Sequence, residues 1–265
     1  MKDWQSMRAL VISDIHGNLH ALEAVLKVAQ GCSGSGFDEI WNLGDLVGYG
    51  AHPNEVIDTL RASPARRVLH VRGNHDRVCC GLSSSQGFNP VAALAALWTR
   101  QHLRPENREW LRALPMGPIE AGRGVLCVHG SPLHEDQYIA SMRDAWIPLR
   151  RMPAEVAFFG HTHLQGAFSC RGESWSEDAP AYTEGSRDEV QQFTLAMLAG
   201  SRYLINPGGV GQPRDGDWRA AFAIYDQSER QVTFYRTPYD VAAAQGAIRA
   251  AGLPERLAAR LTTGR

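Results

Sequence analysis

Residues 69–76 of this chain read LHVRGNHD, and they join an apolar strand to a polar loop. The strand is predicted over Arg67–Val71. Asn74, His75 and Asp76 then place an amide, an imidazole and a carboxylate in a row, and these groups cannot all be buried without partners. The same groups suit a site that holds a metal ion and a phosphate. Taken alone, the stretch is equally compatible with a polar turn. The other blocks of the sequence decide between a turn and a functional site.

An earlier strand ends in a similar group of polar residues. Arg8–Ser13 is predicted to be a strand that leads into Asp14 and His16. These residues are two positions apart, so on an extended backbone their side chains point the same way. Asn18 is a favourable N-cap for the helix that follows, and that helix is predicted to end near Gly31.

The next strand, predicted over Glu39–Leu43, leads into Asp45 and a run rich in glycine. Three glycines within residues 44–50 imply an unusual backbone that lies close to a neighbouring group. Pro53 opens the next helix. The resulting order of strand, helix, strand, helix and strand is typical of an α/β fold, in which ligands bind at the carboxyl ends of the strands.

Two later strands end in histidines. Gly124–Val128 leads into His129, and Glu155–Phe159 leads into His161 and His163. The two-residue spacing seen at Asp14 and His16 therefore recurs at the last of these strands. Each of the five predicted strands thus delivers a polar group where it ends.

The remaining elements are predicted from hydrophobic periodicity. A helix over 89–103 has Val91, Leu94, Leu97 and Trp98 on one face. Other helices are predicted over 106–114, 141–150, 240–250 and 253–261, and strands over 193–198, 203–205, 220–225 and 231–235. Polar residues dominate 171–192, which predicts a long surface loop or a β-excursion. No repeat or linker interrupts the pattern, so a single domain is predicted over residues 1–265.

The composition narrows the class of function. With 265 residues, of which 44% are hydrophobic and 21% charged, the chain is typical of a soluble globular protein. A formal net charge of −1 provides no general basic field for nucleic acid or anionic membrane. No membrane span or signal peptide is predicted. The five cysteines form no CxxC pair, which favours a reducing, cytoplasmic setting.

The polar groups at the strand ends form one set of candidate functional residues. They are Asp14, His16, Asp45, Asn74, His75, His129, His161 and His163. Five of the ten histidines fall in these short segments, a distribution that packing does not explain. Clustered imidazoles repel one another when protonated and leave nitrogens without partners when buried neutral, and a bound cation removes both problems.

The types of donor atom select a class of metal. The set contains no cysteine, which argues against a structural zinc site and against an iron–sulfur cluster. Carboxylate, amide and imidazole donors together suit divalent ions of manganese, iron, zinc, cobalt or nickel. The set offers more donors than one such ion needs. Two ions that share one bridging carboxylate are the economical solution.

Five blocks of the sequence resemble the calcineurin-like metallophosphoesterases, in the order in which that family carries them. The blocks are Asp14-x-His16, Gly44-Asp45, Gly73-Asn74-His75-Asp76, His129-Gly130 and Gly160-His161-Thr162-His163. Residues 206–214, which read NPGGVGQPR, resemble the small bacterial phosphodiesterase-like branch. The resemblance implies an α/β fold with four layers, an α-β-β-α sandwich of two mixed sheets flanked by helices.

The resemblance also implies a role for each residue. One metal ion would be held by Asp14, His16 and His163 and the other by Asn74, His129 and His161, with Asp45 bridging the two. A hydroxide held between the ions would attack phosphorus in a phosphodiester or phosphomonoester bond of a small substrate. His75 would protonate the leaving alcohol, and Asp76 would orient His75. Manganese is the ion expected to support activity in vitro.

One departure from the family pattern concerns the substrate. Protein Ser/Thr phosphatases and symmetrical dinucleoside tetraphosphate hydrolases carry Asp-Arg-Gly in the second block, whereas residues 47–50 read VGYG. The missing arginine weakens the case for a protein phosphatase and for a dinucleoside polyphosphate hydrolase. Both activities nevertheless stay as alternatives. Arg214 could contact the substrate phosphate instead, although an arginine that simply lies at the surface is the plainer interpretation.

Two further functions are less well supported. A nuclease would show a basic stripe or a capping domain, and the sequence shows neither, so no sequence-specific nucleic-acid partner is expected. Some proteins of this fold have lost their ligands and act as scaffolds. Every ligand and His75 are present here, which favours an enzyme over a non-enzymatic scaffold.

Overall fold

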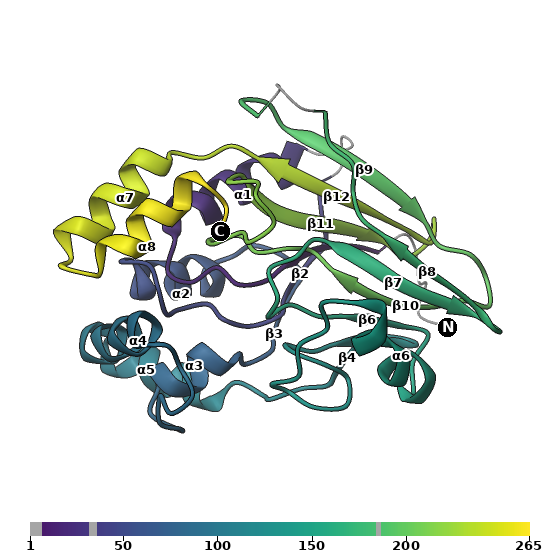
Figure 1. Ribbon diagram of the computed structural model, residues 1–265, viewed down its shortest axis with the longest axis horizontal. Coiled ribbons are helices and arrows are strands. Elements are labelled where there is room, and N and C mark those ends of the chain that lie inside the picture. Colours follow the sequence, from purple (N-terminus) through teal and green to yellow (C-terminus); the bar gives the residue numbers. More distant parts are fainter. Residues whose placement is uncertain (1–6, 32–35, 184–186) are drawn as a thin grey trace.

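Two six-stranded mixed sheets lie face to face in the computed structural model (Figure 1), which describes residues 7–31, 36–183 and 187–265. The first sheet has the order β3-β2-β1-β11-β12-β9. Its strands are β1 (Arg8–Ile12), β2 (Glu39–Asn42), β3 (Arg67–His70), β9 (Gln191–Ala196), β11 (Ala220–Asp226) and β12 (Gln231–Thr237). Strands β1, β2 and β3 are parallel to one another, and the other neighbours are antiparallel.

The second sheet has the order β4-β5-β6-β10-β7-β8. Its strands are β4 (Ile119–Gly122), β5 (Val125–Cys127), β6 (Val156–Phe158), β7 (Gly166–Arg171), β8 (Ser174–Asp178) and β10 (Arg202–Asn206). Strands β5, β6 and β10 are parallel, so the carboxyl ends of β5 and β6 meet at one edge of the sheet. This arrangement places the segments after these two strands beside each other.

Helices α1 (Leu19–Gly31) and α2 (Pro53–Arg61) cover the outer face of the first sheet, and α6 (Met142–Arg151) covers that of the second. The other helices are α3 (Asn74–Cys79), α4 (Pro90–His102), α5 (Pro105–Ala113), α7 (Val241–Ala250) and α8 (Glu255–Ala259). Leu22 of α1 and Ile57 of α2 are buried in a cluster with residues of the first sheet. Leu149 of α6 is buried with Phe168 of the second sheet. The four layers confirm the predicted α-β-β-α sandwich.

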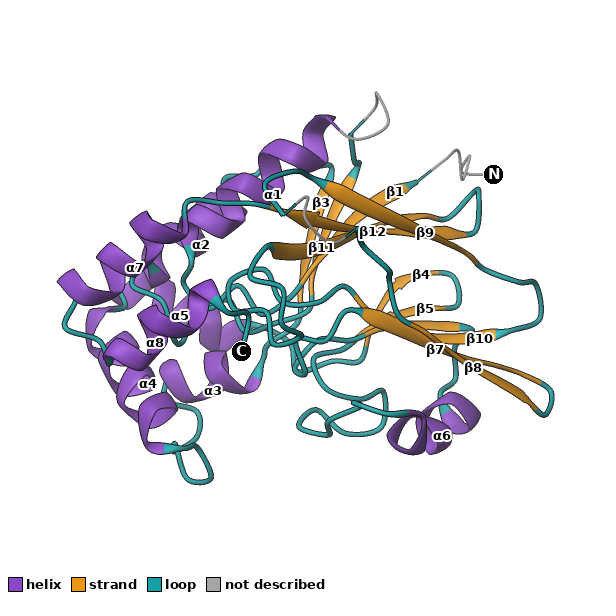
Figure 2. Cartoon of the chain, turned by 45° about the horizontal axis from the view of Figure 1, so that its top comes forward, coloured by secondary structure: helices purple, strands orange, loops and turns teal. Residues whose placement is uncertain are grey.

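The other helices gather at one end of the sandwich. Figure 2 shows α3, α4, α5, α7 and α8 on one side of the molecule and most of the strands on the other, with loops between them. Helices α4, α7 and α8 share a buried cluster with Tyr49, which belongs to the segment after β2. The loops that follow the strands are therefore enclosed between the sheets and these helices.

The core between the two sheets is built around Trp41. This residue of β2 is paired in register with Val11 of β1 and Leu69 of β3, and all three are buried in the cluster between the sheets. The Trp41 ring lies 5.7 Å from the ring of Phe158 and 5.8 Å from that of Tyr225, measured between centroids. Phe158 belongs to the second sheet, so the indole joins both layers.

The predicted apolar face of α4 is only partly the buried one, since Val91 and Trp98 pack against the core and Leu94 and Leu97 do not. The buried residues of the helix are Ala92, Ala95, Ala96 and Thr99, whereas Leu94 is 57% and Leu97 is 53% exposed. The small side chains allow α4 to lie close to the segment after β2, where Thr99 Oγ1 donates to the Gly48 carbonyl at 3.0 Å. The size of the apolar side chains was thus a misleading guide to the buried face.

Replacement of Trp41 by alanine is expected to destabilise the protein by about 3–5 kcal/mol, because it removes a fully buried ring between the sheets. Leu94→Ala is the control, since this side chain is exposed and its loss is expected to cost less than about 0.5 kcal/mol. Urea denaturation measures both free energies of unfolding. A small loss for Trp41→Ala or a large one for Leu94→Ala would show that the core lies elsewhere.

Other segments differ from their prediction in the strand pairing. Strands β4 and β7 were not predicted, and β8 pairs with β7, so a β-excursion is the correct alternative for the first part of 171–192. Residues 184–186 lie outside the described part. The predicted strands at 193–198 and 203–205 exist as β9 and β10, but they belong to different sheets. The chain therefore crosses between the sheets at residues 197–201.

No helix in the described ranges is long and apolar enough to cross a lipid bilayer. Four cysteines, at positions 79, 80, 127 and 170, are buried free thiols. Cys32 and the first six residues, on which the prediction of no signal peptide rests, lie outside the described residues.

Candidate metal centre

The seven predicted metal ligands meet at the carboxyl ends of five strands. Asp14 and His16 follow β1, Asp45 follows β2, Asn74 follows β3, His129 follows β5, and His161 and His163 follow β6. Six of them form two groups whose donor atoms lie within 4.8 Å of one another, Asp14 with His16 and His163, and Asp45 with His129 and His161. The Asn74 Oδ1 atom joins the second group at 3.1 Å from His129 Nε2.

The backbone at five of these residues has a left-handed conformation. The φ angle is +56° at Asp14, +51° at His16, +54° at Asp45, +66° at His161 and +61° at His163. Arg230 is the one other non-glycine residue with positive φ in the described ranges. The prediction that Asp14 and His16 project from an extended backbone is therefore wrong. Strained backbone of this kind concentrates at functional sites, where surrounding contacts hold it in place.

Backbone carbonyls hold three of the histidine rings in one tautomer. The Nδ1 atoms of His16, His129 and His163 each face a carbonyl oxygen. The distances are 3.2 Å to Val47 O, 2.9 Å to Leu43 O and 2.5 Å to Gln212 O, respectively. A carbonyl can only accept a hydrogen bond, so each Nδ1 donates, and in the neutral ring each Nε2 keeps its lone pair. This is the tautomer that binds metal through Nε2.

Donor atoms from different strands approach one another closely. His163 Nε2 lies 3.3 Å from His16 Nε2 and 3.2 Å from Asp14 Oδ1. Asp45 Oδ2 lies 3.7 Å from His16 Nε2 and 3.4 Å from His129 Nε2. The Asp45 carboxylate is therefore the group that lies between the two sets of donors.

Bound metal ions would satisfy atoms that the protein itself leaves without partners. The Asp14 Oδ1 and His161 Nε2 atoms are buried and have no hydrogen-bond partner among the described residues. By contrast, Asp14 Oδ2 accepts from the His161 amide at 3.0 Å. Two Nε2 lone pairs that face each other, as at His16 and His163, also repel unless a cation lies between them. The donor set therefore fits a metal centre.

Burial and charge set the pKa values in the site. Burial raises the pKa of Asp14 to about 6 and lowers the pKa of His161 to about 3. Burial also opposes charge on Asp45 and His129, but their mutual attraction outweighs it. The pKa of His129 rises to about 9, and the pKa of Asp45 falls well below its usual range. A metal ion would displace the His129 proton, because ligands bind metal in their deprotonated form.

The Gly73–Asp76 block begins a helix instead of forming the predicted loop. Helix α3 starts at Asn74, and Asp76 accepts hydrogen bonds from the amides of Gly73 at 3.0 Å and Val47 at 3.2 Å. Within the described part of the chain, no hydrogen bond joins Asp76 to the His75 ring. Adjacent helix residues do not face each other, so the expectation that Asp76 orients His75 is corrected. Asp76 instead fastens the segment after β2 to α3.

His75 lies against three rings. The centroid distances are 4.6 Å to Tyr49, 4.6 Å to Phe88 and 4.9 Å to His16. Its Nδ1 atom is buried and has no hydrogen-bond partner among the described residues, and burial lowers the pKa of His75 to about 4. A Cβ atom at Gly48, where φ is +135°, would lie 2.6 Å from this Nδ1. The predicted close approach of the glycine-rich run is thereby confirmed.

A cleft of about 520 Å³ opens beside the metal ligands and His75. The other side chains that define its chemistry are aromatic or cationic, namely Tyr49, Phe88, Tyr138, Arg214, Arg256 and Arg260. The volume is that of a site for a small molecule. Arg214, the predicted phosphate contact, lines this cleft, and its Nη2 donates to Gln212 Oε1 at 3.3 Å.

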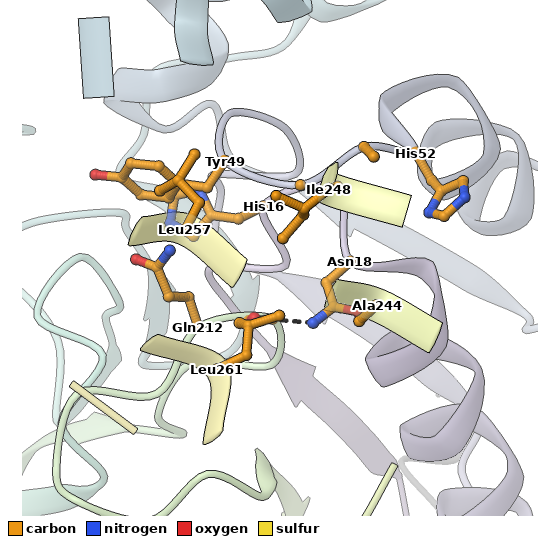
Figure 3. Close-up of a pocket in the computed structure, with 13 residues that line it drawn as sticks. His16, Asn18, Tyr49, His52, Gln212, Ala244, Ile248, Leu257 and Leu261 are labelled. Carbon is orange, nitrogen blue, oxygen red and sulfur yellow. Dashed lines mark hydrogen bonds between the residues drawn. The ribbon is translucent and has the colours of Figure 1, made fainter. Parts of the chain in front are cut away.

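The C-terminal helices cover another side of the site. Figure 3 shows side chains of α7 and α8 gathered beside His16, Asn18 and Tyr49. The hollow between them has a volume of about 10 Å³, which is room for about one water molecule. A substrate therefore has room in the larger cleft and not in this hollow.

Several residues of the cleft were missed in the sequence, among them Tyr138, Arg256 and Arg260. Tyr138 lies in the segment after β5, and Arg256 and Arg260 lie in and just after α8. They are far from the ligand blocks, and the packing of α7 and α8 brings the arginines to the cleft. The four-residue spacing of the two arginines, which puts them on one helical face, was the available signal.

The sequence blocks, the fold and the site agree with a comparison to known families. A family model described as calcineurin-like phosphoesterase matches residues 7–184, which is more than half of the chain. This chain belongs to the calcineurin-like phosphoesterase family. Membership in the family accounts for the aspartate and histidine cluster as a metal-binding site and indicates a phosphoester hydrolase.

Individual proteins of known sequence or structure are also similar to this chain. The chain is 35% identical over 257 residues to Uncharacterized protein MJ0912 of Methanocaldococcus jannaschii, a match that covers 96% of this chain and 97% of that protein. The fold resembles a metallophosphoesterase from Sphaerobacter thermophilus, with a TM-score of 0.80, 40% identity, and coverage of 98% of this chain and 99% of that chain. A symmetrical bis(5′-nucleosyl)-tetraphosphatase of Haemophilus ducreyi is 27% identical over 125 residues, which are 46% of this chain and 44% of that protein.

Proposed function

We propose that this protein is a dinuclear metal-dependent phosphoesterase that hydrolyses phosphodiester or phosphomonoester bonds of small substrates. The observation that carries the proposal is the position of Asp45, whose Oδ2 faces His16 Nε2 at 3.7 Å and His129 Nε2 at 3.4 Å. Asp45 would be shared by two ions, one held by Asp14, His16 and His163 and the other by Asn74, His129 and His161. When bound, two divalent ions would supply an activated water nucleophile and neutralise charge on the phosphoryl oxygens.

The chain's own residues would position the substrate and move the proton. The carbonyl oxygens that face Nδ1 of three histidines keep the Nε2 atoms available as ligands. His75 follows the ligand Asn74 and lines the cleft, so it would donate a proton to the leaving alcohol. Arg214 would contact a phosphoryl oxygen from the same cleft.

Protein purified without a chelator and reconstituted with manganese or zinc is expected to hold about two metal ions per chain, because the predicted ligands divide into two groups of donors. Elemental analysis after dialysis measures the stoichiometry, and protein treated with a chelator serves as the control. A value near zero would overturn the metal assignment. A value near one would leave a mononuclear site and overturn the bridging role of Asp45.

Hydrolysis of dinucleoside polyphosphates is the second candidate, because part of the chain is similar to a tetraphosphatase. Residues 47–50 contain no arginine, which argues against that activity and against a protein phosphatase. Metal-loaded protein should therefore be assayed with bis(p-nitrophenyl) phosphate, p-nitrophenyl phosphate and diadenosine tetraphosphate. Turnover of the simple esters supports the proposal, and turnover of the dinucleotide alone supports the second candidate. No turnover with two ions bound would favour a non-catalytic scaffold.

A further inference from the structure

The cleft extends beyond the metal ligands to a group of three arginines. Arg214, Arg256 and Arg260 all line it, together with ligands such as Asp45 and His161. Arg256 is exposed on α8, whereas Arg214 and Arg260 are half-buried. The three guanidinium groups therefore lie within reach of a small molecule whose reacting phosphate is at the metal centre.

No aspartate or glutamate side chain neutralises these arginines in the described part of the chain. Among the residues that the structure describes, none of the three forms an ion pair with an aspartate or a glutamate within 4.0 Å. The carboxylate next to Arg256 in the sequence, Glu255, turns to Arg249 instead, at 2.7 Å. Burial and the charges of Arg214 and Arg256 lower the pKa of Arg260. The group therefore carries about three positive charges that repel one another.

The hydrogen-bonding capacity of the arginines is also only partly satisfied. Arg214 Nε is buried and has no hydrogen-bond partner in the described ranges. One Arg214 hydrogen bond goes to the neutral Gln212 side chain, at 3.3 Å, and Arg260 Nε donates to a main-chain oxygen of Arg265. Unpaired guanidinium donors inside a cleft are typical of a binding site for phosphate or carboxylate groups, which match the guanidinium fork in shape and charge.

We propose that the substrate carries a second phosphate group beyond the one that is hydrolysed, and that Arg256 and Arg260 bind it. This inference rests on the proposed function, because it assumes that the reacting phosphate lies at the metal centre. One phosphate there would be balanced by the metal ions and Arg214, and it would leave Arg256 and Arg260 without a partner. The cleft volume of about 520 Å³ suits a small bisphosphate and not a long polymer.

A matched pair of substrates tests this inference. The p-nitrophenyl ester of thymidine 5′-phosphate and the same ester with an added 3′-phosphate share the reacting bond and the leaving group. The metal-loaded protein is expected to hydrolyse the 3′-phosphorylated ester with a kcat/KM about 10-fold higher or more, the worth of one charge-assisted contact. Arg256→Glu and Arg260→Ala are expected to lose this preference.

Arg151→Glu is the matched control, because Arg151 is exposed at the end of α6 and does not line the cleft. It changes the net charge as Arg256→Glu does, and it is expected to keep the preference and the basal turnover. Thermal unfolding of each variant checks that α8 is intact.

Calorimetric titration with propane-1,3-bisphosphonate and with propylphosphonate gives a readout without turnover, and the bisphosphonate is expected to bind about 10-fold more tightly to the wild type.

The outcomes separate this inference from the proposed function. Equal kcat/KM values for the two esters, or a preference that survives Arg256→Glu and Arg260→Ala together, would overturn the second phosphate site and leave the phosphoesterase intact. A preference that Arg151→Glu also abolishes would show a general charge effect and overturn it too. If the metal-loaded protein hydrolyses neither ester nor bis(p-nitrophenyl) phosphate, the proposed function fails, and this inference fails with it.

Discussion

Asp45→Ala is expected to lose metal from both positions and to lower turnover by more than about 10²-fold. The side chain is buried, and its Oδ2 is the oxygen that faces both groups of donors, so no other carboxylate in the site can replace it. Removal of a residue that only hydrogen-bonds a metal ligand typically lowers metal affinity or activity 10–100-fold. Removal of a shared ligand should cost more than that. Metal content after dialysis and turnover of bis(p-nitrophenyl) phosphate are to be measured on the same samples.

Two further variants test whether Asp45 acts as a ligand shared by both ions. His16→Ala removes a donor of one group, so it should mainly weaken one ion. Asp45→Asn keeps an oxygen that can accept from the His75 amide, a bond of 2.8 Å in the wild type, but lacks the charge. If Asp45→Ala keeps its full metal content and activity, the bridging assignment is wrong. If His16→Ala loses both ions, the two groups do not bind metal separately.

The fold class and the ligand set could be predicted because the information is local. Each ligand directly follows an apolar strand, and parallel strands bring their carboxyl ends to one edge. Asn74 and His129 are 55 residues apart, yet a donor atom of one lies 3.1 Å from a donor of the other. Strands β3 and β5 belong to different sheets, so the packing of the two sheets against each other brings these donors together. The sequence pattern predicted both strands, whereas only the family resemblance implied two sheets.

The conformation of the ligands could not be predicted from the same blocks. Asp14 and His16 take positive φ angles because their amides donate to the carbonyls of Gly44 at 3.0 Å and Asp45 at 2.9 Å. Those partners belong to another segment, and no pattern within residues 14–18 contains them. The inward face of α4 and the arrival of Arg256 at the cleft likewise depend on which surfaces the helices pack against.

His75→Ala is expected to keep both metal ions and to lose about 10²–10⁴-fold in turnover of an alkyl phosphate ester, the usual contribution of a positioned proton donor. The imidazole lines the cleft and has a buried Nδ1 without a partner among the described residues. Burial lowers the pKa of His75 to about 4 in the free protein. A substrate phosphate would favour the imidazolium, because a nearby negative charge stabilises the protonated form.

The way the loss of turnover depends on the leaving group tests whether His75 acts as an acid. An alkoxide leaves poorly without a proton, so the alkyl ester should suffer most from His75→Ala, whereas p-nitrophenolate leaves unaided and its ester should suffer less. His70→Ala controls for the loss of an imidazole outside the cleft. An equal loss on both esters would assign His75 to phosphate positioning. Loss of a metal ion would make His75 a ligand, in keeping with its position within 4.8 Å of donors on His16 and Asp45, and the leaving oxygen would then need a different proton donor.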